Sequence, residues 1–151
     1  MNRYLVDANV LLRWLDSSDP QHAIAKNAID TLDEQGHDLH ITAQNVIEFW
    51  AVASRPLHNN GFGWDVARCY SSVSLLLKSF EYSPDTAAIF DEWQRLVAKH
   101  SVTSLHVHDT RLVAVIKTHN LDGILTFNEK HFRRFEANEN IVVLEPAAVN
   151  Q

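Results

Sequence analysis

Short apolar runs alternate with longer helix-like segments along the whole chain, and this alternation constrains the fold more than any other feature. Five runs are predicted to be strands, namely Arg3–Asp7, Leu39–Thr42, Phe80–Tyr82, Ile124–Thr126 and Ile141–Leu144. Because helical segments separate the strands, we expect the strands to run parallel, with helices covering both faces of the sheet. The sequence therefore predicts an α/β fold.

Capping residues place the helix boundaries. The first helix is expected to end at Leu15, and the second to begin at Asp19-Pro20 and to end at Gly36. Thr42 is expected to cap a helix that carries Glu48. Further helices are predicted from about Trp64 to Ser79, from Ser83-Pro84-Asp85 onward and from about His108 to Asn120, with Arg55–Gly63 as the main loop.

The composition is that of an ordinary globular protein. With 151 residues, 46% of them apolar and 21% charged, the chain is expected to form one domain over 1–151. The single cysteine, Cys69, predicts a small buried residue in a reducing compartment. No run resembles a signal peptide or reaches the roughly 20 apolar residues of a membrane helix. We therefore expect a cytoplasmic protein without a membrane partner.

The formal net charge of −6 argues against a passive coat for nucleic acid, which would be basic. It leaves room for an enzyme with an acidic metal site. The C-terminal third nevertheless has a local basic bias, from Lys99, Arg111, Lys117, Lys130, Arg133 and Arg134. This bias predicts either a functional patch or an ordinary solvated surface.

Three carboxylates lie in apolar surroundings, where an acidic group needs a partner or a metal. Asp7 ends the first predicted strand, Glu48 lies between bulky apolar residues of its helix, and Asp109 precedes an apolar helical run. Ligands of open parallel sheets bind at the carboxyl ends of the strands. Asp7, Asp109 and Asn128 are expected at that edge, and one cleft can also include Glu48.

Each of these residues also has a purely structural interpretation. Asp7 and Asp109 could be helix caps, and Asn128 could cap the short segment 129–134. Glu48 could belong to a solvated stripe of its helix. The joint pattern favours a shared cation, because clustered carboxylates repel one another. Oxygen ligands with sparse coordination suit Mg²⁺ or Mn²⁺, which can activate water for attack on a phosphodiester.

Four segments, in this order, resemble the motifs of PIN-domain nucleases, and most closely those of VapC-type toxins. They are LVDANVL (5–11), NVIEF (45–49), HDTRLVA (108–114) and LTFNEKHF (125–132). The resemblance implies a PIN-like three-layer sandwich with a parallel sheet of about five strands. It also implies a Mg²⁺-dependent endoribonuclease that cuts structured RNA, forms a homodimer and is inhibited by a small antitoxin protein.

The resemblance assigns roles to residues of this chain. Asp7, Glu48 and Asp109 would be the catalytic and metal-binding carboxylates, while Asn9 and Thr126 would orient the site. Asn128 would support the site as a neutral residue where many relatives carry Asp, and His131 stands where another acidic residue is frequent. A second tightly held metal is therefore not expected. Weak candidates for RNA contacts are Arg111, Lys130 and Arg133.

Other interpretations remain open. His106-Val107-His108-Asp109 resembles part of a zinc hydrolase motif, but further ligands at suitable spacing are missing. Paired histidines could support a metal-free ribonuclease. The chain could also be a catalytically weak module that binds RNA or protein, or a stand-alone nuclease without an antitoxin. Five aromatic residues are expected mainly in the core, with a dimer seam or an antitoxin groove as the alternative: Phe49, Trp50, Phe62, Trp64 and Tyr70.

Overall fold

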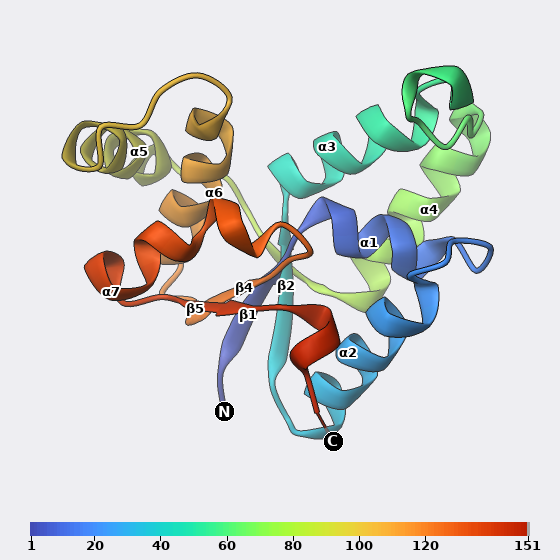
Figure 1. Ribbon diagram of the computed structural model, residues 1–151, viewed down its shortest axis with the longest axis horizontal. Coiled ribbons are helices and arrows are strands. Elements are labelled where there is room, and N and C mark those ends of the chain that lie inside the picture. The colour runs from blue at the N-terminus through green and yellow to red at the C-terminus, as the bar shows by residue number, and fades with distance from the viewer. Residues whose placement is uncertain (151) are drawn as a thin grey trace.

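A five-stranded sheet, in which every pairing is parallel, forms the centre of the computed structural model, which describes residues 1–150 (Figure 1). The strands are β1 (Arg3–Val6), β2 (Asp38–Thr42), β3 (Glu81–Ser83), β4 (Gly123–Leu125) and β5 (Val142–Leu144). Their order across the sheet is β3-β2-β1-β4-β5. The prediction of an α/β fold with about five parallel strands is confirmed.

Within residues 1–150, seven α-helices connect the strands. They are α1 (Ala8–Leu15), α2 (His22–Glu34), α3 (Ala43–Ser54), α4 (Val66–Ser79), α5 (Ala87–Lys99), α6 (His106–Thr118) and α7 (Glu136–Glu139). Short 3₁₀ turns include η1 (Leu57–Asn59), η2 (Glu129–His131), η3 (Arg133–Phe135) and η4 (Pro146–Ala148). In this part of the chain, no helix has the length and apolar character needed to cross a membrane.

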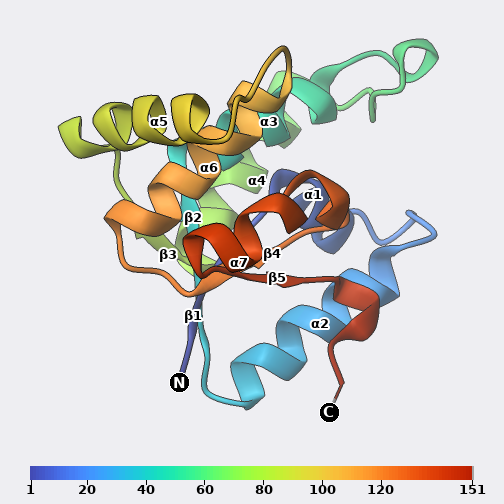
Figure 2. The same ribbon diagram turned by 60° about the vertical axis from the view of Figure 1, so that its left-hand side comes forward.

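Helices cover both faces of the sheet because side chains alternate along each strand. In β1, Tyr4 and Val6 belong to a core shared with α1, α2, α3 and α4. Leu5, between them, belongs to a second core shared with α5 and α6. Figure 1 shows α1, α2 and α4 on one side of the strands and α5 and α6 on the other, and Figure 2 shows α5 packed alongside α6. The result is the predicted three-layer sandwich.

The carboxyl ends of β1, β2 and β4 lie at one edge of the sheet, the upper edge in Figure 1. The chain continues from β1 to the neighbouring β2, whereas β4 pairs with the opposite side of β1. The order therefore reverses between β1 and β4, which is where ligands of open α/β sheets bind. Asp7 directly follows β1, and Thr126 directly follows β4.

Three predicted boundaries differ from the observed ones. The third strand is Glu81–Ser83 rather than Phe80–Tyr82, because the Phe80 backbone N–H still bonds to Leu76 in the last turn of α4. Ser83 is not a helix cap: it pairs with Thr42 of β2, whose hydroxyl also donates to the Ser83 carbonyl oxygen. Consequently α5 begins only after Thr86.

Two further helices begin elsewhere than predicted. The second helix begins at His22, because the Asp19 carboxylate accepts a hydrogen bond from the Gln21 backbone and holds Asp19-Pro20-Gln21 in a turn. Helix α6 begins at His106, two residues before the predicted start. Asp109 therefore lies in the first turn of α6 and is not its cap. This excludes the interpretation of Asp109 as a helix-capping residue.

Candidate active site

Asp7 is both a helix cap and a buried carboxylate at the centre of the site. Its Oδ1 accepts a hydrogen bond of 2.8 Å from the Ala8 backbone at the start of α1. Its Oδ2 accepts one of 2.8 Å from the Thr126 hydroxyl and a longer one, 3.4 Å, from Asn9 Nδ2. Only 5% of the residue is exposed. The capping role therefore explains one carboxylate oxygen and leaves the other facing polar side chains of the site.

Asn9 and Thr126 fasten the ends of β1 and β4 to each other. Asn9 Nδ2 donates to the Thr126 hydroxyl at 3.3 Å, and Asn9 Oδ1 accepts a hydrogen bond of 3.1 Å from the Phe127 backbone. The Thr126 hydroxyl can then donate only toward Asp7, because it also accepts from the Asn128 backbone at 2.9 Å. This arrangement suits residues that orient the Asp7 carboxylate.

Glu48 reaches the same edge from α3 and is half-buried. Its Oε1 accepts a hydrogen bond of 2.8 Å from Gln44 Nε2, one turn earlier in the helix. Gln44 also donates to the His108 carbonyl oxygen at 2.8 Å and accepts a hydrogen bond from Arg111 at 3.2 Å. Gln44 therefore connects Glu48 on α3 to the first turns of α6, where Asp109 lies.

Asp109 faces the turn that follows β4. Its Oδ2 lies 3.0 Å from Nδ1 of His131, the last residue of η2. The side chain is 25% exposed, so the carboxylate remains accessible from solvent. The structure thus places all three predicted carboxylates at the β1–β4 reversal, on three different elements.

The electrostatics show that the three carboxylates influence one another. Burial, together with the negative charges of Glu48 and Asp109, raises the pKa of Asp7 to about 6, against the hydrogen bonds from Thr126 and Ala8. Burial also raises the pKa of Glu48, and the charge of Asp109 adds to this shift. The pKa of Asp109 is raised by burial and partly lowered by His131. A cation placed among them would stabilise their charged forms.

The donor chemistry at this edge fits a hard divalent cation. Asp7, Glu48 and Asp109 supply carboxylate oxygens, and the donors that contact Asp7 are neutral. Within residues 1–150, no group of three or more His, Cys, Asp and Glu side chains is arranged to hold a metal ion, and this includes both the three carboxylates and the pair His106 and His108. Carboxylate oxygens are the ligands that Mg²⁺ prefers, and Mg²⁺ retains several waters beside few protein ligands.

Of the four remaining predicted site residues, Arg133 is the one that lies away from the carboxylates. The Asn128 side chain is exposed, and its backbone carbonyl oxygen accepts from the His131 backbone at 3.0 Å. Arg111 lies beside the site, donating to Gln44 and, at 3.3 Å, to Asp85. Lys130 is exposed on η2 next to the site. Arg133, by contrast, is held away from the carboxylates by contacts with acidic side chains near β5, Glu136 and Glu145.

Two functional partners of the carboxylates were not assigned roles from the sequence. The sequence patterns above single out no role for Gln44, and His131 was expected only as a departure from the family pattern. The four-residue spacing could have suggested the hydrogen bond between Gln44 and Glu48 within α3, whereas the contacts of Gln44 and His131 with α6 depend on packing that no local sequence signal records.

A surface hollow borders the candidate site. It has a volume of about 310 Å³ and is lined by Glu48 and Gln44 together with Ile47, Asp85, His108 and Arg111.

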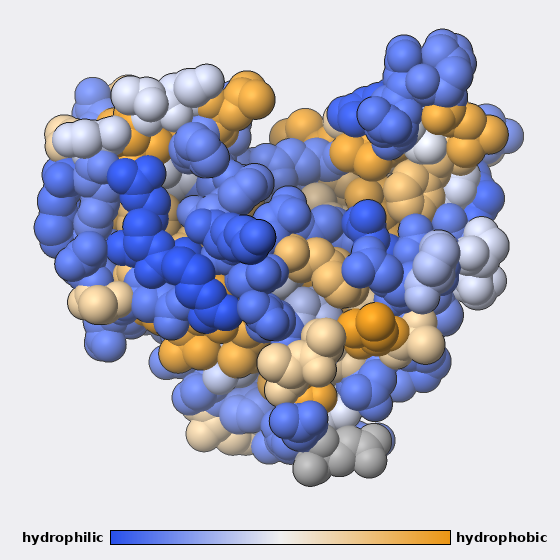
Figure 3. All heavy atoms as spheres, viewed as in Figure 1, coloured by the Kyte–Doolittle hydropathy of each residue, from blue (hydrophilic) through white to orange (hydrophobic). Residues whose placement is uncertain are grey.

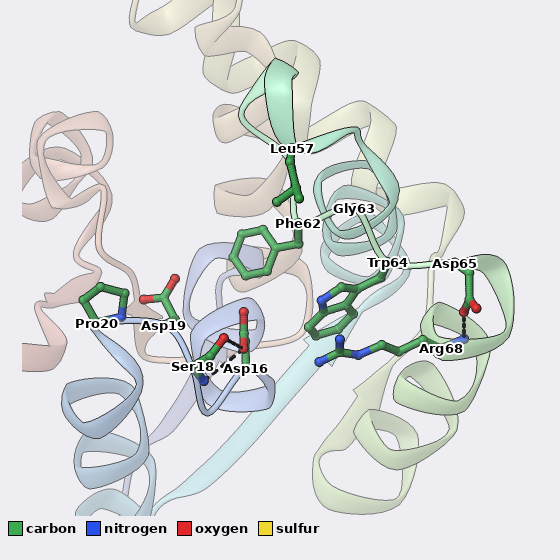
Figure 4. A pocket seen from close by; sticks show the side chains of 11 residues that line it. Asp16, Ser18, Asp19, Pro20, Leu57, Phe62, Gly63, Trp64, Asp65 and Arg68 are labelled. Carbon is green, nitrogen blue, oxygen red and sulfur yellow. Dashed lines mark hydrogen bonds between the residues drawn. The ribbon is translucent and has the colours of Figure 1, made fainter.

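A larger hollow, about 700 Å³, lies between the α1–α2 and α3–α4 connections (Figure 4). There Arg68 stacks 3.7 Å from the Trp64 ring, beside the carboxylates of Asp16, Asp19 and Asp65. In Figure 3, a notch separates the α5–α6 side from the α3–α4 side.

Solved structures share this fold over nearly the whole chain, at low sequence identity. The VapBC2 complex of Rickettsia felis, bound to a DNA fragment from its promoter, is 12% identical, with a TM-score of 0.66 over 95% of this chain and 98% of that chain. VapC20 of Mycobacterium tuberculosis, described as a toxin that cleaves the sarcin–ricin loop, is 13% identical, with a TM-score of 0.64 over 92% and 96%. FitAcB of Neisseria gonorrhoeae is 17% identical, with a TM-score of 0.66 over 96% and 99%.

The sequence itself identifies the family. No curated protein sequence matches the chain significantly. The family model of the PIN domain, however, matches residues 4–138, which include both ends of the site, from Asp7 to His131. The expected resemblance is confirmed, and the chain belongs to the PIN domain family.

Proposed function

We propose that the protein is a Mg²⁺-dependent endoribonuclease and the toxin of a toxin–antitoxin pair. The observation that carries this proposal is the set of three mutually repelling carboxylates, Asp7, Glu48 and Asp109, at the sheet edge where the strand order reverses. The solved neighbours that are toxins support the physiological role, and one of them is described as cleaving the sarcin–ricin loop. Unpaired loops are physically suitable substrates, because unstacked nucleotides expose their backbone.

Asp7 and Asp109 would hold the cation, with Glu48 binding directly or through water, and Mn²⁺ would be an acceptable substitute. A bound divalent cation supplies charge neutralisation at the phosphate and lowers the pKa of a bound water. Thr126 and Asn9 keep the Asp7 carboxylate in one orientation throughout. The chain thereby provides a prearranged set of oxygen ligands.

Glu48 is the residue placed to accept a proton. Gln44 occupies its Oε1, so Oε2 is left to take the proton of the attacking water. Attack of the water oxygen on phosphorus breaks the bond to the 3′ oxygen, which leaves with a proton from solvent. The products would be a 5′-phosphate and a 3′-hydroxyl.

A cleavage assay on a stem–loop RNA tests this function. The wild-type protein should cut with Mg²⁺ or Mn²⁺ and stop in EDTA, Asp7→Asn should abolish cleavage, and Asp30→Asn, a surface carboxylate on α2, should leave it unchanged. Cleavage by Asp7→Asn would overturn the scheme. Activity in EDTA with cyclic phosphate products would indicate the metal-free histidine mechanism, and no cleavage under any condition would favour a binding module.

The 700 Å³ pocket is a suitable docking site for a basic, partly apolar segment of the antitoxin. Leu57, Phe62 and Trp64 line it, together with the carboxylates of Asp16, Asp19 and Asp65 and the guanidinium of Arg68, so its lining carries more negative than positive charge and complements a basic segment. With the product of a small neighbouring gene as the partner, Leu57→Asp should weaken the complex at least about tenfold. Leu77→Asp, on α4 outside this pocket and 48% exposed against 76% for Leu57, is the control, and equal binding by all three proteins would exclude this pocket.

We also propose a homodimer. Ile47 and Phe90 are large, exposed apolar residues that line two adjoining hollows, and both hollows include His108 and Arg111. Exposed apolar patches of this kind are typical of interfaces between protein subunits. A second copy seated there would border the Glu48 side of the site.

A further inference from the structure

One short segment, Thr126–His131, contacts two of the three carboxylates. At its beginning, the Thr126 hydroxyl donates to Asp7 Oδ2 at 2.8 Å. At its end, His131 Nδ1 lies 3.0 Å from Asp109 Oδ2. The segment itself is held in a tight turn, because the His131 backbone N–H donates to the Asn128 carbonyl oxygen at 3.0 Å. It therefore links a carboxylate at the end of β1 to one on α6.

The contact between His131 and Asp109 uses only one oxygen of the carboxylate. Nδ1 of His131 lies 3.0 Å from Oδ2, and within the described residues no other ion pair involves this carboxylate. A carboxylate on an exposed helix turn can otherwise rotate between several orientations. The imidazole thus selects one orientation and leaves Oδ1 available for another partner.

We propose that His131 is the positioning residue for Asp109: it holds Oδ2 through Nδ1 so that Oδ1 is presented to the divalent cation. This inference rests on the proposed function. Hydrogen-bond partners of metal ligands commonly alter metal affinity by 10–100-fold, because they fix the ligand before the metal arrives.

A neighbouring histidine provides a matched control. The His106 ring lies 5.5 Å from the His131 ring, centroid to centroid, at an interplanar angle of 87°. It belongs to the same turn of α6 as Asp109, but within the described residues no ion pair joins its ring to that carboxylate, unlike the ring of His131. Loss of His106 removes an imidazole and a ring contact from the same cluster while keeping the contact between His131 and Oδ2.

The test measures Mn²⁺ binding to the purified full-length protein by calorimetry and by the loss of the free-ion electron spin resonance signal. His131→Ala should raise the Kd for Mn²⁺ by about 10-fold or more. His131→Asn keeps a donor near the position of Nδ1 and should restore binding to within about threefold of wild type, as should His106→Ala. Thermal unfolding in EDTA, compared across the variants, identifies any that fail to fold.

The outcomes separate this inference from the proposed function. If His131→Ala binds Mn²⁺ as wild type does, or if His131→Asn binds as weakly as His131→Ala, the positioning role is wrong. Asp7→Asn serves as the reference in the same titration. If it too binds Mn²⁺ with wild-type affinity, the metal site itself is refuted. If it loses binding while His131→Ala retains it, only the role of His131 fails.

Discussion

At the scale of single residues, the charge of Asp7 lowers the stability of the folded protein. The carboxylate is buried at the end of β1, where desolvation and two neighbouring negative charges disfavour its ionised form. Its pKa rises from 3.8 in the unfolded chain to about 6 in the folded one. The contribution of Asp7 to the stability of the metal-free protein is therefore most favourable below pH 3.8, and up to about 3 kcal/mol of it is lost as the pH rises through 6.

Removing this charge should therefore stabilise the metal-free protein. In EDTA at pH 7.5, Asp7→Asn should raise the free energy of unfolding by about 1–2 kcal/mol. This gain is smaller than the full charge penalty, because an amide at position 7 cannot replace both carboxylate oxygens as acceptors and would lose or weaken the hydrogen bond from Asn9. Urea denaturation at pH 7.5 and pH 5 measures the gain, which should shrink at the lower pH. A variant less stable than wild type at pH 7.5 in EDTA would contradict the charge argument.

The carboxylates could be predicted from the sequence because each is anomalous in its own surroundings. Asp7 ends an apolar strand, and Glu48 lies among bulky apolar helix residues, so local context alone raises the question of a partner. Gln44 and His131 are ordinary in their own segments. Their roles arise only when α3 and η2 pack against α6, which no local pattern records.

At the scale of elements, a buried carboxylate on the short helix α7 fastens this helix to α5. The Glu139 side chain is 3% exposed and accepts hydrogen bonds of 2.7 Å from each of Arg95, Lys99 and His100. Burial alone would raise the pKa of Glu139, but these three donors lower it to about 2. Helix α7 is only four residues long, so its own backbone hydrogen bonds are too few to keep it helical without such contacts.

The lowered pKa predicts how the stability of this anchor depends on pH. Because the folded pKa of about 2 lies below the unfolded value of 4.5, the contribution is complete above pH 4.5 and is lost as the pH falls toward 2. Glu139→Gln should therefore lower the free energy of unfolding by about 2–3 kcal/mol at pH 7, and the difference from wild type should narrow below pH 4.5.

Denaturant unfolding at pH 7 and pH 3.5 measures this difference. Glu136→Gln is the matched control, because its ion pair with Arg133 is solvent-exposed and should contribute less than about 1 kcal/mol. If the difference in unfolding free energy between Glu139→Gln and wild type stays constant across this pH range, the charge of Glu139 is not what stabilises α7.

The order and type of the elements followed from periodicity, whereas their ends depended on distant contacts. The five strands and the long helices were predicted correctly because apolar spacing reports which face is buried. Ser83-Pro84 carries a strong helix-start signal, yet Ser83 remains in β3 because its pairing with Thr42 satisfies its backbone. Strand pairing across the molecule thus outweighed a local capping preference.

At the scale of the whole molecule, three of the six basic residues of the C-terminal third have partners around α7. Lys99 and Lys117 donate to the side chain and the backbone of Glu139, respectively, while Arg133 pairs with Glu136 and Glu145. These three residues stabilise the packing of α7 and the end of the sheet. Arg111 and Lys130 remain beside the site as candidate contacts for a phosphate backbone.

The last prediction concerns dimer formation through two exposed apolar residues near Glu48, Ile47 and Phe90. Phe90, 60% exposed, stacks on Trp93, and Ile47 is 67% exposed across the shared His108 and Arg111. If a second copy covers them, a charge placed there must be desolvated on association. Phe90→Glu and Ile47→Glu should each raise the dimer Kd at least about 100-fold, the equivalent of roughly 3 kcal/mol.

Light scattering coupled to size exclusion, across a dilution series, measures the change in mass. Val66→Glu is the control, since Val66 is as exposed as Ile47 but lies at the start of α4, outside both hollows. If the wild-type protein is monomeric at tens of micromolar, this face is not a dimer interface. The same conclusion follows if Val66→Glu dissociates the dimer as much as Phe90→Glu and Ile47→Glu do. Because Glu48 lines one of the hollows, a dimer formed there also predicts that the variants lose RNA cleavage in proportion to their loss of association.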